Sequence, residues 1–114
     1  MKRKDTKVYA DIVENYCSTR HYVEYKKKEI SNSYEGIGRA KATYDTIVNK
    51  NNAEIRMWYN TYVDILRMNA GMSENIIEEK TEKIKELEHI LKEDYQEDLD
   101  KLYDEWLIKE HLKK

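Results

Sequence analysis

At 114 residues, the chain has room for one compact domain or for a small domain with an extended helical arm. The chain has no Pro and only 3 Gly, and these are too few turn-forming residues for strands connected by tight turns. The sequence therefore predicts an all-α protein. A single Cys excludes an internal disulfide, and no apolar run approaches the ~20 residues of a membrane span. Because the basic N-terminus lacks the apolar region of a signal peptide, we expect a cytoplasmic protein without membrane association.

Charge is distributed unevenly along the chain, although the net charge is only −2. Residues 1–50 hold 11 Lys/Arg against 7 Asp/Glu, whereas residues 74–114 hold 8 against 14. A basic front and an acidic back predict head-to-tail contacts, an anionic partner at the front, or both.

The first expected helix covers residues 5–30, and Asp5 or Thr6 can cap its N-terminus. Residues 31–38 are small and polar and contain two glycines that tolerate positive φ, so we expect a break there. For residues 39–50 a helix or turn is favoured, with an irregular loop or a short hairpin as alternatives. The apolar stripe of the first helix consists of Tyr9, Ile12, Val13, Tyr16, Val23 and Ile30.

A second helix is expected over residues 52–69, ended by Gly71 as a C′ glycine. Ser73 then resembles the N-cap of a third helix over residues 74–112. The apolar residues of the second helix recur at helical spacing and include Ile55, Trp58, Tyr59, Tyr62, Ile65 and Leu66.

The expected third helix is long, acidic and amphipathic. Three successive steps of four between residues 87 and 99 shift its apolar line, which disfavours a simple two-stranded coil. A rod of roughly 58 Å is longer than one small domain can cover. It therefore either kinks near Asp94 and Tyr95 or pairs with another chain. The apolar line, predicted as a partner or oligomer interface, consists of Ile77, Ile84, Leu87, Leu91, Tyr95, Leu99, Leu102 and Trp106.

These elements predict a small helical bundle or hairpin that forms a homo-oligomer. Its helical body, with a basic N-terminal face, would comprise residues 1–73, and residues 74–114 would be an acidic arm for assembly or docking.

The sequence contains only weak matches to motifs that indicate a catalytic site or a metal-binding site. Cys17 and His21 share a helical face, but no further ligands or triad partners stand at suitable spacing. Glu86-x-x-His89 is a single match to a motif that di-metal bundles need on each of two helices. Gly36-x-Gly38 lacks the third glycine of a dinucleotide fingerprint and is interpreted as a turn. We expect no enzyme, no cofactor and no metal.

Basic residues in the first half of the chain are interleaved with Tyr22, Tyr25 and Tyr34, a pattern that suits phosphate contacts with aromatic support. The alternative is a solvated helix face whose charge is cancelled by nearby acids. The candidate nucleic-acid-binding residues are Lys2, Arg3, Lys4, Lys7, Lys26, Lys27, Lys28, Arg39 and Lys41.

Over residues 5–76 the layout resembles the small subunit of a tailed-phage terminase. The proline residues typical of that family at the start of its second helix and after its Gly-Leu-Thr are missing here, and residues after 74 lie outside the match. The resemblance implies a non-catalytic protein in the host-cell cytoplasm that binds double-stranded DNA at the packaging site, assembles into a ring and recruits the large subunit. The matching segments are residues 8–17, 35–38, 48–55 and 64–73.

The competing interpretation is a small acidic helical inhibitor or adaptor that binds a protein, such as a phage anti-defence protein that mimics DNA. Its acidic helix would fill a basic groove on the target. The two hypotheses differ in the charges that matter: Lys26–Lys28 for DNA binding, and Glu78, Glu79, Glu82 and Glu86 for the inhibitor.

Overall fold

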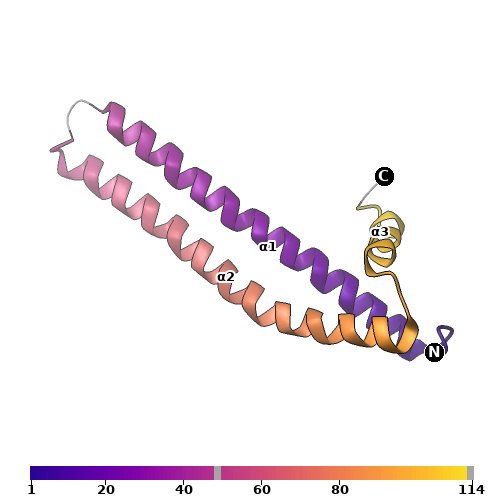
Figure 1. Ribbon diagram of the computed structural model, residues 1–114. Coiled ribbons are helices and arrows are strands. Elements are labelled where there is room, and N and C mark those ends of the chain that lie inside the picture. Colours follow the sequence, from indigo (N-terminus) through magenta and orange to yellow (C-terminus); the bar gives the residue numbers. More distant parts are fainter. Residues whose placement is uncertain (48–49, 113–114) are drawn as a thin grey trace. The chain divides into compact units, whose positions relative to one another are not determined.

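The computed structural model describes residues 1–47 and 50–112, and every regular element in those two ranges is an α-helix. Helices α1 (Lys7–Thr46) and α2 (Ala53–Tyr95) pack against each other as a hairpin, and α3 (Leu99–Lys109) follows (Figure 1). The expected all-α helical hairpin is therefore confirmed.

The chain divides into two compact units. Unit 1 comprises Met1–Val23 and Glu79–Lys114, and unit 2 comprises Glu24–Glu78. Each unit thus contains a segment of α1 and a segment of α2, and unit 1 also contains α3.

Helix α1 begins where the sequence indicates, because the Thr6 hydroxyl accepts a hydrogen bond from the Tyr9 N–H at 3.2 Å. The expected break over residues 31–38 is wrong, since α1 continues to Thr46. Gly36 lies inside the helix, where a Cβ atom would stand 3.0 Å from Cδ1 of Leu66. No glycine in the described ranges has a positive φ. The glycine therefore permits a close approach of two helices, and the interpretation of Gly36-x-Gly38 as a turn is also wrong.

Helix α2 begins after Asn52, whose side-chain oxygen accepts from the Glu54 N–H at 2.8 Å. It then runs without interruption to Tyr95, so the expected helix end at Gly71 and the expected N-cap at Ser73 are both wrong. Ser73 is 4% exposed, and its hydroxyl donates to Glu29 at 3.1 Å. A serine in the middle of a helix is here explained by a tertiary hydrogen bond rather than by a cap.

The expected single helix over residues 74–112 is also wrong, because the chain leaves helical geometry directly after Tyr95. Gln96 has a φ of 54°, and the Asp98 side chain caps α3 by accepting from the Lys101 N–H at 3.3 Å. Of the two alternatives expected for this long helix, a kink near Asp94 and Tyr95 or pairing with another chain, the structure agrees with the first. The break lets α3 bury Leu99 and Tyr103 in unit 1.

Unit 1 encloses a core of large side chains from all three helices. Tyr9 and Tyr95 place their ring centroids 4.9 Å apart, and the Trp106 indole donates to Glu14 at 2.8 Å. The buried members are Tyr16, Cys17, Leu91, Tyr95, Leu99 and Tyr103.

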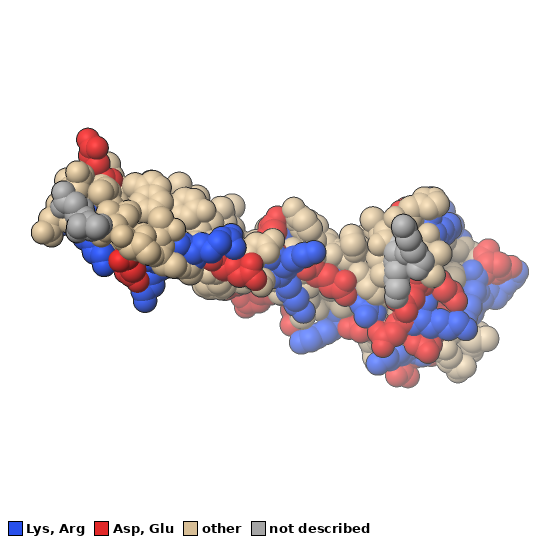
Figure 2. Space-filling view, turned by 90° about the horizontal axis from the view of Figure 1, so that it is seen from above, with Lys and Arg blue, Asp and Glu red and all other residues tan. Residues whose placement is uncertain are grey.

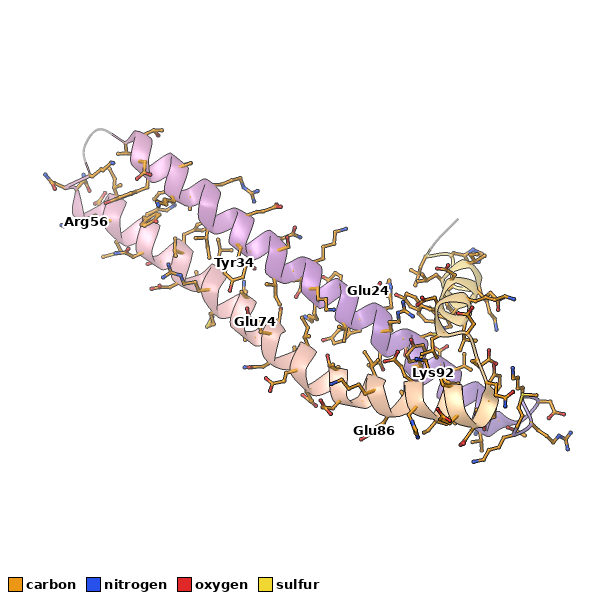
Figure 3. All side chains as sticks on the ribbon, viewed as in Figure 1. Glu24, Tyr34, Arg56, Glu74, Glu86 and Lys92 are labelled. Carbon is orange, nitrogen blue, oxygen red and sulfur yellow. The ribbon has the colours of Figure 1, made fainter. Side chains whose placement is uncertain are left out.

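Unit 2 buries small residues instead. Across its two helices the Tyr34 hydroxyl donates to Glu74 at 3.2 Å, and these two side chains point toward each other (Figure 3). Tyr44 and Tyr59 stack at 4.4 Å. The buried residues of unit 2 are Ser33, Gly36, Ala40, Val63, Ala70 and Ser73.

Candidate functional site

The basic start of the chain and its acidic end meet inside unit 1. The Lys2 backbone N–H donates a hydrogen bond to the Asp94 carbonyl oxygen at 2.8 Å, and three ion pairs join the same two segments of the chain. Head-to-tail contact, one of the outcomes expected from the charge asymmetry, is therefore realised within one chain. The ion pairs are Lys2–Asp94 at 3.1 Å, Lys4–Glu97 at 2.7 Å and Arg20–Asp100 at 3.0 Å.

This contact removes most of the charge asymmetry seen along the sequence. Unit 1 holds 13 Lys/Arg against 15 Asp/Glu, and unit 2 holds 8 against 8. Blue and red side chains interleave on the face shown in Figure 2, and an uncharged area covers part of unit 2 near the α1–α2 connection. The strongly basic front that favoured nucleic acid is thus largely neutralised.

The candidate nucleic-acid-binding residues are divided between the two units, and most of them pair with acids of their own unit. Lys2 and Lys4 pair with acids of unit 1, and Arg3 pairs with Asp5 at 2.6 Å. In unit 2, Lys26 pairs with Glu29 at 3.0 Å, and Arg39 lies 3.8 Å from Glu35. Of the nine candidates, those that are exposed and have no ion pair within the described ranges are Lys7 in unit 1 and Lys27, Lys28 and Lys41 in unit 2.

One carboxylate joins several of these contacts in unit 1. Glu97 accepts a hydrogen bond from the Tyr9 hydroxyl at 2.7 Å and pairs with Lys4. Although partial burial opposes ionisation, the hydrogen bonds from Lys4 and Tyr9 lower the pKa of Glu97 below its ordinary value. Burial and the same hydrogen bond raise the pKa of Tyr9. Through its contacts with Lys4 and Tyr9, Glu97 connects the N-terminal segment to the turn before α3.

The predicted interface of the C-terminal helix is largely covered by its own chain. Leu91, Tyr95 and Leu99 are buried in the core of unit 1, and Ile77 belongs to unit 2. Burial within one chain thus supplies what a second chain was expected to supply. The partly buried members that pack against the core are Ile84, Leu87, Leu102 and Trp106.

A different apolar surface is exposed in unit 2. Six large side chains of α2, between 42% and 69% exposed, form what we call the α2 outer face: Met57, Trp58, Tyr62, Ile65, Met68 and Met72.

The α2 outer face contains a shallow groove of about 430 Å³ that runs from Glu54 to Ile65. The rings of Trp58 and Tyr62 stack at 6.3 Å with an interplanar angle of 11°, which orients both side chains. Sequence reasoning placed Trp58, Tyr62 and Ile65 on the apolar stripe of the second helix, but it did not recognise that α2 has two apolar faces. The buried series Val63, Ala70 and Ser73, on another face of the helix, is the signal that separates them.

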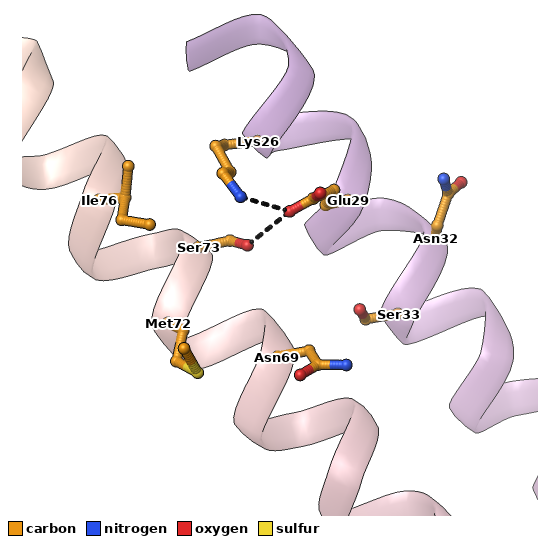
Figure 4. Close-up of a pocket in the computed structure, with 8 residues that line it drawn as sticks. All are labelled: Lys26, Glu29, Asn32, Ser33, Asn69, Met72, Ser73 and Ile76. Atoms are coloured by element: carbon orange, nitrogen blue, oxygen red, sulfur yellow. Dashed lines mark hydrogen bonds and ion pairs between the residues drawn. The ribbon is translucent and has the colours of Figure 1, made fainter. Parts of the chain in front are cut away.

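A polar pocket of about 420 Å³ lies between the helices of unit 2 (Figure 4). Its centre is Glu29, which accepts hydrogen bonds from Lys26 at 3.0 Å and from Ser73 at 3.1 Å. Hydrogen bonds from Lys26, Tyr25 and Ser73 lower the pKa of Glu29. In the described part of the chain no buried side-chain polar atom is left without a partner, so the contacts at this pocket are explained by helix pairing.

The residues considered for chemistry are buried in unreactive settings or exposed without a metal-binding group of described residues around them. Cys17 is fully buried, and burial raises the pKa of its thiol to about 11, which keeps the thiol protonated at neutral pH. His21 Nδ1 lies 3.4 Å from the Tyr103 hydroxyl. Glu86 and His89 are both exposed on α2. Among residues 1–47 and 50–112, no group of three or more His, Cys, Asp or Glu side chains is placed to hold a metal ion.

None of the helices in these ranges has the length and apolar content needed to span a membrane. No protein-family model, curated protein or solved structure matches the chain. The terminase resemblance therefore stays a prediction.

Proposed function

We propose that this chain is a non-catalytic protein that acts by binding another protein through the α2 outer face. The observation that carries the proposal is the exposure of six large apolar side chains on one side of a single helix. From the sizes of these side chains, their exposed area is about 600 Å², the upper end of the largest patches on monomeric proteins, which are often functional.

The composition of this face supports protein recognition. Aromatic residues and Met are enriched at the centres of protein interfaces, where charged residues are depleted. At helical spacing, residues 58, 61, 62, 65, 68, 69 and 72 share the face, and none of them is charged; Glu54 lies at the end of the groove. Met side chains adapt to irregular partner surfaces, and the stacked rings of Trp58 and Tyr62 supply rigid anchors.

The absence of catalysis is part of the same proposal. The thiol of Cys17 is buried and protonated at neutral pH. Glu29, the acid at the centre of the polar pocket, is ion-paired and hydrogen-bonded within unit 2. These groups are explained by the packing of the helices without a reaction.

Site-specific photo-crosslinking in the cells that produce the protein tests this function. A photoreactive amino acid at Met68, on the α2 outer face, is expected to crosslink to a protein that mass spectrometry can identify. The matched control places the same amino acid at Lys28, an exposed position on α1. Equal protein adducts at both positions, or none at Met68, would contradict the proposal.

A DNA-binding function, with the assembly role implied by the terminase resemblance, is the second candidate. The observation that favours it is that Lys27, Lys28 and Lys41 are exposed on α1 and have no ion pair within the described ranges. Fluorescence anisotropy with double-stranded DNA at ~50 mM salt tests it, because phosphate-driven affinity is strongest at low salt. We expect reversal of these three lysines to Glu to abolish binding if this candidate holds. A wild-type protein that does not bind DNA at that salt concentration rules it out.

The acidic-inhibitor form of the adaptor hypothesis has its own test. The four acidic residues that it requires are all exposed: Glu78, Glu79, Glu82 and Glu86. If they contact a basic partner, their reversal to Lys should remove the crosslink at Met68, whereas reversal of Lys27 and Lys28 to Glu should leave it intact.

A further inference from the structure

We infer that the partner of the α2 outer face is a second copy of this chain, with the two α2 helices antiparallel about a twofold axis at Ile65. The inference rests on the proposed function, because it names the occupant of the same face. It differs from the oligomer interface expected from the sequence, whose residues are largely covered within unit 1.

The outer face is complementary to itself. In an antiparallel pair centred on Ile65, residues at equal distances before and after it face each other. The ring of Trp58 then meets Met72 of the second copy, and Tyr62 meets Met68. Ile65 meets Ile65, so each aromatic ring is opposite a flexible thioether and the centre is aliphatic.

The polar residues of the face follow the same symmetry. Thr61 and Asn69 lie four residues before and after Ile65, which places each threonine opposite an asparagine of the second copy. Asn69 also lines the polar pocket between α1 and α2, so this pair lies at the edge of the outer face. Hydroxyl and amide groups can each donate and accept, which satisfies both when the interface excludes water. A parallel pair would instead place Trp58 on Trp58 and Met72 on Met72, without the thioether–aromatic contacts that favour mixed pairing.

The spacing of the large residues suits helix-to-helix packing. Trp58, Ile65 and Met72 are seven residues apart, and Thr61 and Met68 occupy the intervening positions of the same heptads. Tyr62 and Asn69 follow one residue after Thr61 and Met68, so the face consists of a, d and e positions and is wider than the a and d seam of a simple coiled coil. The other helix of the hairpin leaves this face exposed.

Area and charge are also sufficient for a pair. Complete burial of both outer faces, about 600 Å² each, gives at most about 1,200 Å², the lower limit for stable and specific interfaces. Unit 2 has equal numbers of acidic and basic residues, 8 of each, so two copies of it carry no net repulsion. The expected product is a dimer of moderate affinity.

Sedimentation equilibrium of the purified chain, over a series from low micromolar to several hundred micromolar, measures the association directly. We expect the mass to rise with concentration to twice the 13.8 kDa of the chain. Ile65→Glu places two carboxylates opposite each other at the axis and should hold the protein at the monomer mass. The matched control is Ile108→Glu on α3, because Ile108 is 53% exposed and Ile65 is 48% exposed.

Circular dichroism verifies that both variants keep their helices. A folded wild type that stays monomeric across the series, or an Ile65→Glu variant that still dimerises, overturns the inference. A dimer that the Ile108→Glu control also disrupts would overturn the choice of surface.

Single cysteines test the antiparallel arrangement. With oxygen as oxidant, Ile65→Cys should give a disulfide-linked dimer, because the two positions meet at the axis. Trp58→Cys should not link to itself, since its two copies lie about 21 Å apart along the helices, whereas a mixture of Trp58→Cys and Met72→Cys should link. Cys17 is fully buried, so the wild type is the control without a link. Self-linking of Trp58→Cys would contradict the antiparallel pair.

The two proposals fail in distinguishable ways. A monomeric wild type together with a Met68 crosslink to a different protein removes the second copy as the partner and leaves the proposed function intact. A monomer that gives no protein crosslink at Met68 removes both.

Discussion

Units 1 and 2 bury their helices by different means, although the same two long helices contribute to both. Unit 1 buries large side chains such as Tyr16, Leu91 and Tyr95, and α3 adds Leu99 and Tyr103 to that core. The described residues of unit 2 form no helices other than segments of α1 and α2, and they bury small residues at the contact between these two helices. The large apolar side chains of α2 in this unit point outward instead. The difference teaches that apolar content alone does not locate a core, because the same composition can be enclosed by the chain or left for a partner.

The first prediction tests the core of unit 1. Leu91 is 0% exposed, so Leu91→Ala should lower the free energy of unfolding by about 2–5 kcal/mol through lost burial and a cavity. Urea denaturation followed by circular dichroism measures the change. Ile108→Ala, at an exposed position of the same unit, should change stability by less than about 0.5 kcal/mol. Similar losses in the two variants would contradict the distinction between core and surface.

The second prediction concerns Glu97, whose ionised form is favoured in the folded state. Because its folded pKa lies below its ordinary value of 4.5, its contribution is complete above that value and is lost as the pH falls through the lower folded pKa. Glu97→Gln should cost about 1–3 kcal/mol at neutral pH, as expected for hydrogen bonds to a charged group, and should flatten the acid limb of stability against pH. Glu86→Gln, at an exposed position, is the control. An unchanged acid limb in Glu97→Gln would argue against this role.

The alkaline limb provides a related check. The pKa of Tyr9 is raised from its ordinary value of 10.0 by burial and by its hydrogen bond to Glu97. The folded state therefore retains this proton when the unfolded chain has lost it, and stability should fall as the pH rises above that value. Tyr9→Phe removes the titrating group, so its stability should depend less on pH in this range, which thermal denaturation at several alkaline pH values can measure.

The third prediction separates the two interpretations of Gly71. In the structure Gly71 lies inside α2, and a Cβ atom there would meet nothing within 4 Å. Gly71→Ala should therefore stabilise the protein by about 0.5–1 kcal/mol, the difference in helix propensity. Gly36→Ala should gain less, because its Cβ would stand 3.0 Å from Leu66 Cδ1. Destabilisation by Gly71→Ala would instead support a helix end at this position.

The smallest expected effect is that of an exposed ion pair. In the Lys2–Asp94 pair the side chains are 67% and 38% exposed, so Lys2→Ala should change stability by less than about 0.5 kcal/mol. The backbone hydrogen bond from Lys2 to Asp94 is unaffected by the substitution. Denaturation at low and high salt measures the effect. A large, salt-sensitive loss would show that the N-terminal segment depends on charge more than on its other contacts.

Much of the fold could be predicted from the sequence because it depends on local chemistry. The lack of Pro and the scarcity of Gly predicted an all-α chain, and the capping preference of Thr6 predicted the start of α1. The apolar period placed Leu91, Tyr95 and Leu99 on one line of the helix, but they were expected to contact a partner, whereas the structure buries them against the other helices of unit 1. One of two alternatives for the long C-terminal helix, a kink near residue 95, also agrees with the structure.

The remaining features were decided by contacts between segments that are far apart in the sequence. From the sequence alone, Gly36 and Ser73 resemble residues that end or begin a helix. In the structure, the absence of a side chain at Gly36 makes room for Leu66 of the opposite helix, and the Ser73 hydroxyl donates a hydrogen bond to Glu29. The charge asymmetry indicated an external anion or a head-to-tail contact, and only folding pairs Lys4 with Glu97 inside one chain. Periodicity likewise marked α2 as amphipathic, but only tertiary packing determines that Val63, Ala70 and Ser73 are buried and that Trp58, Met68 and Met72 remain exposed.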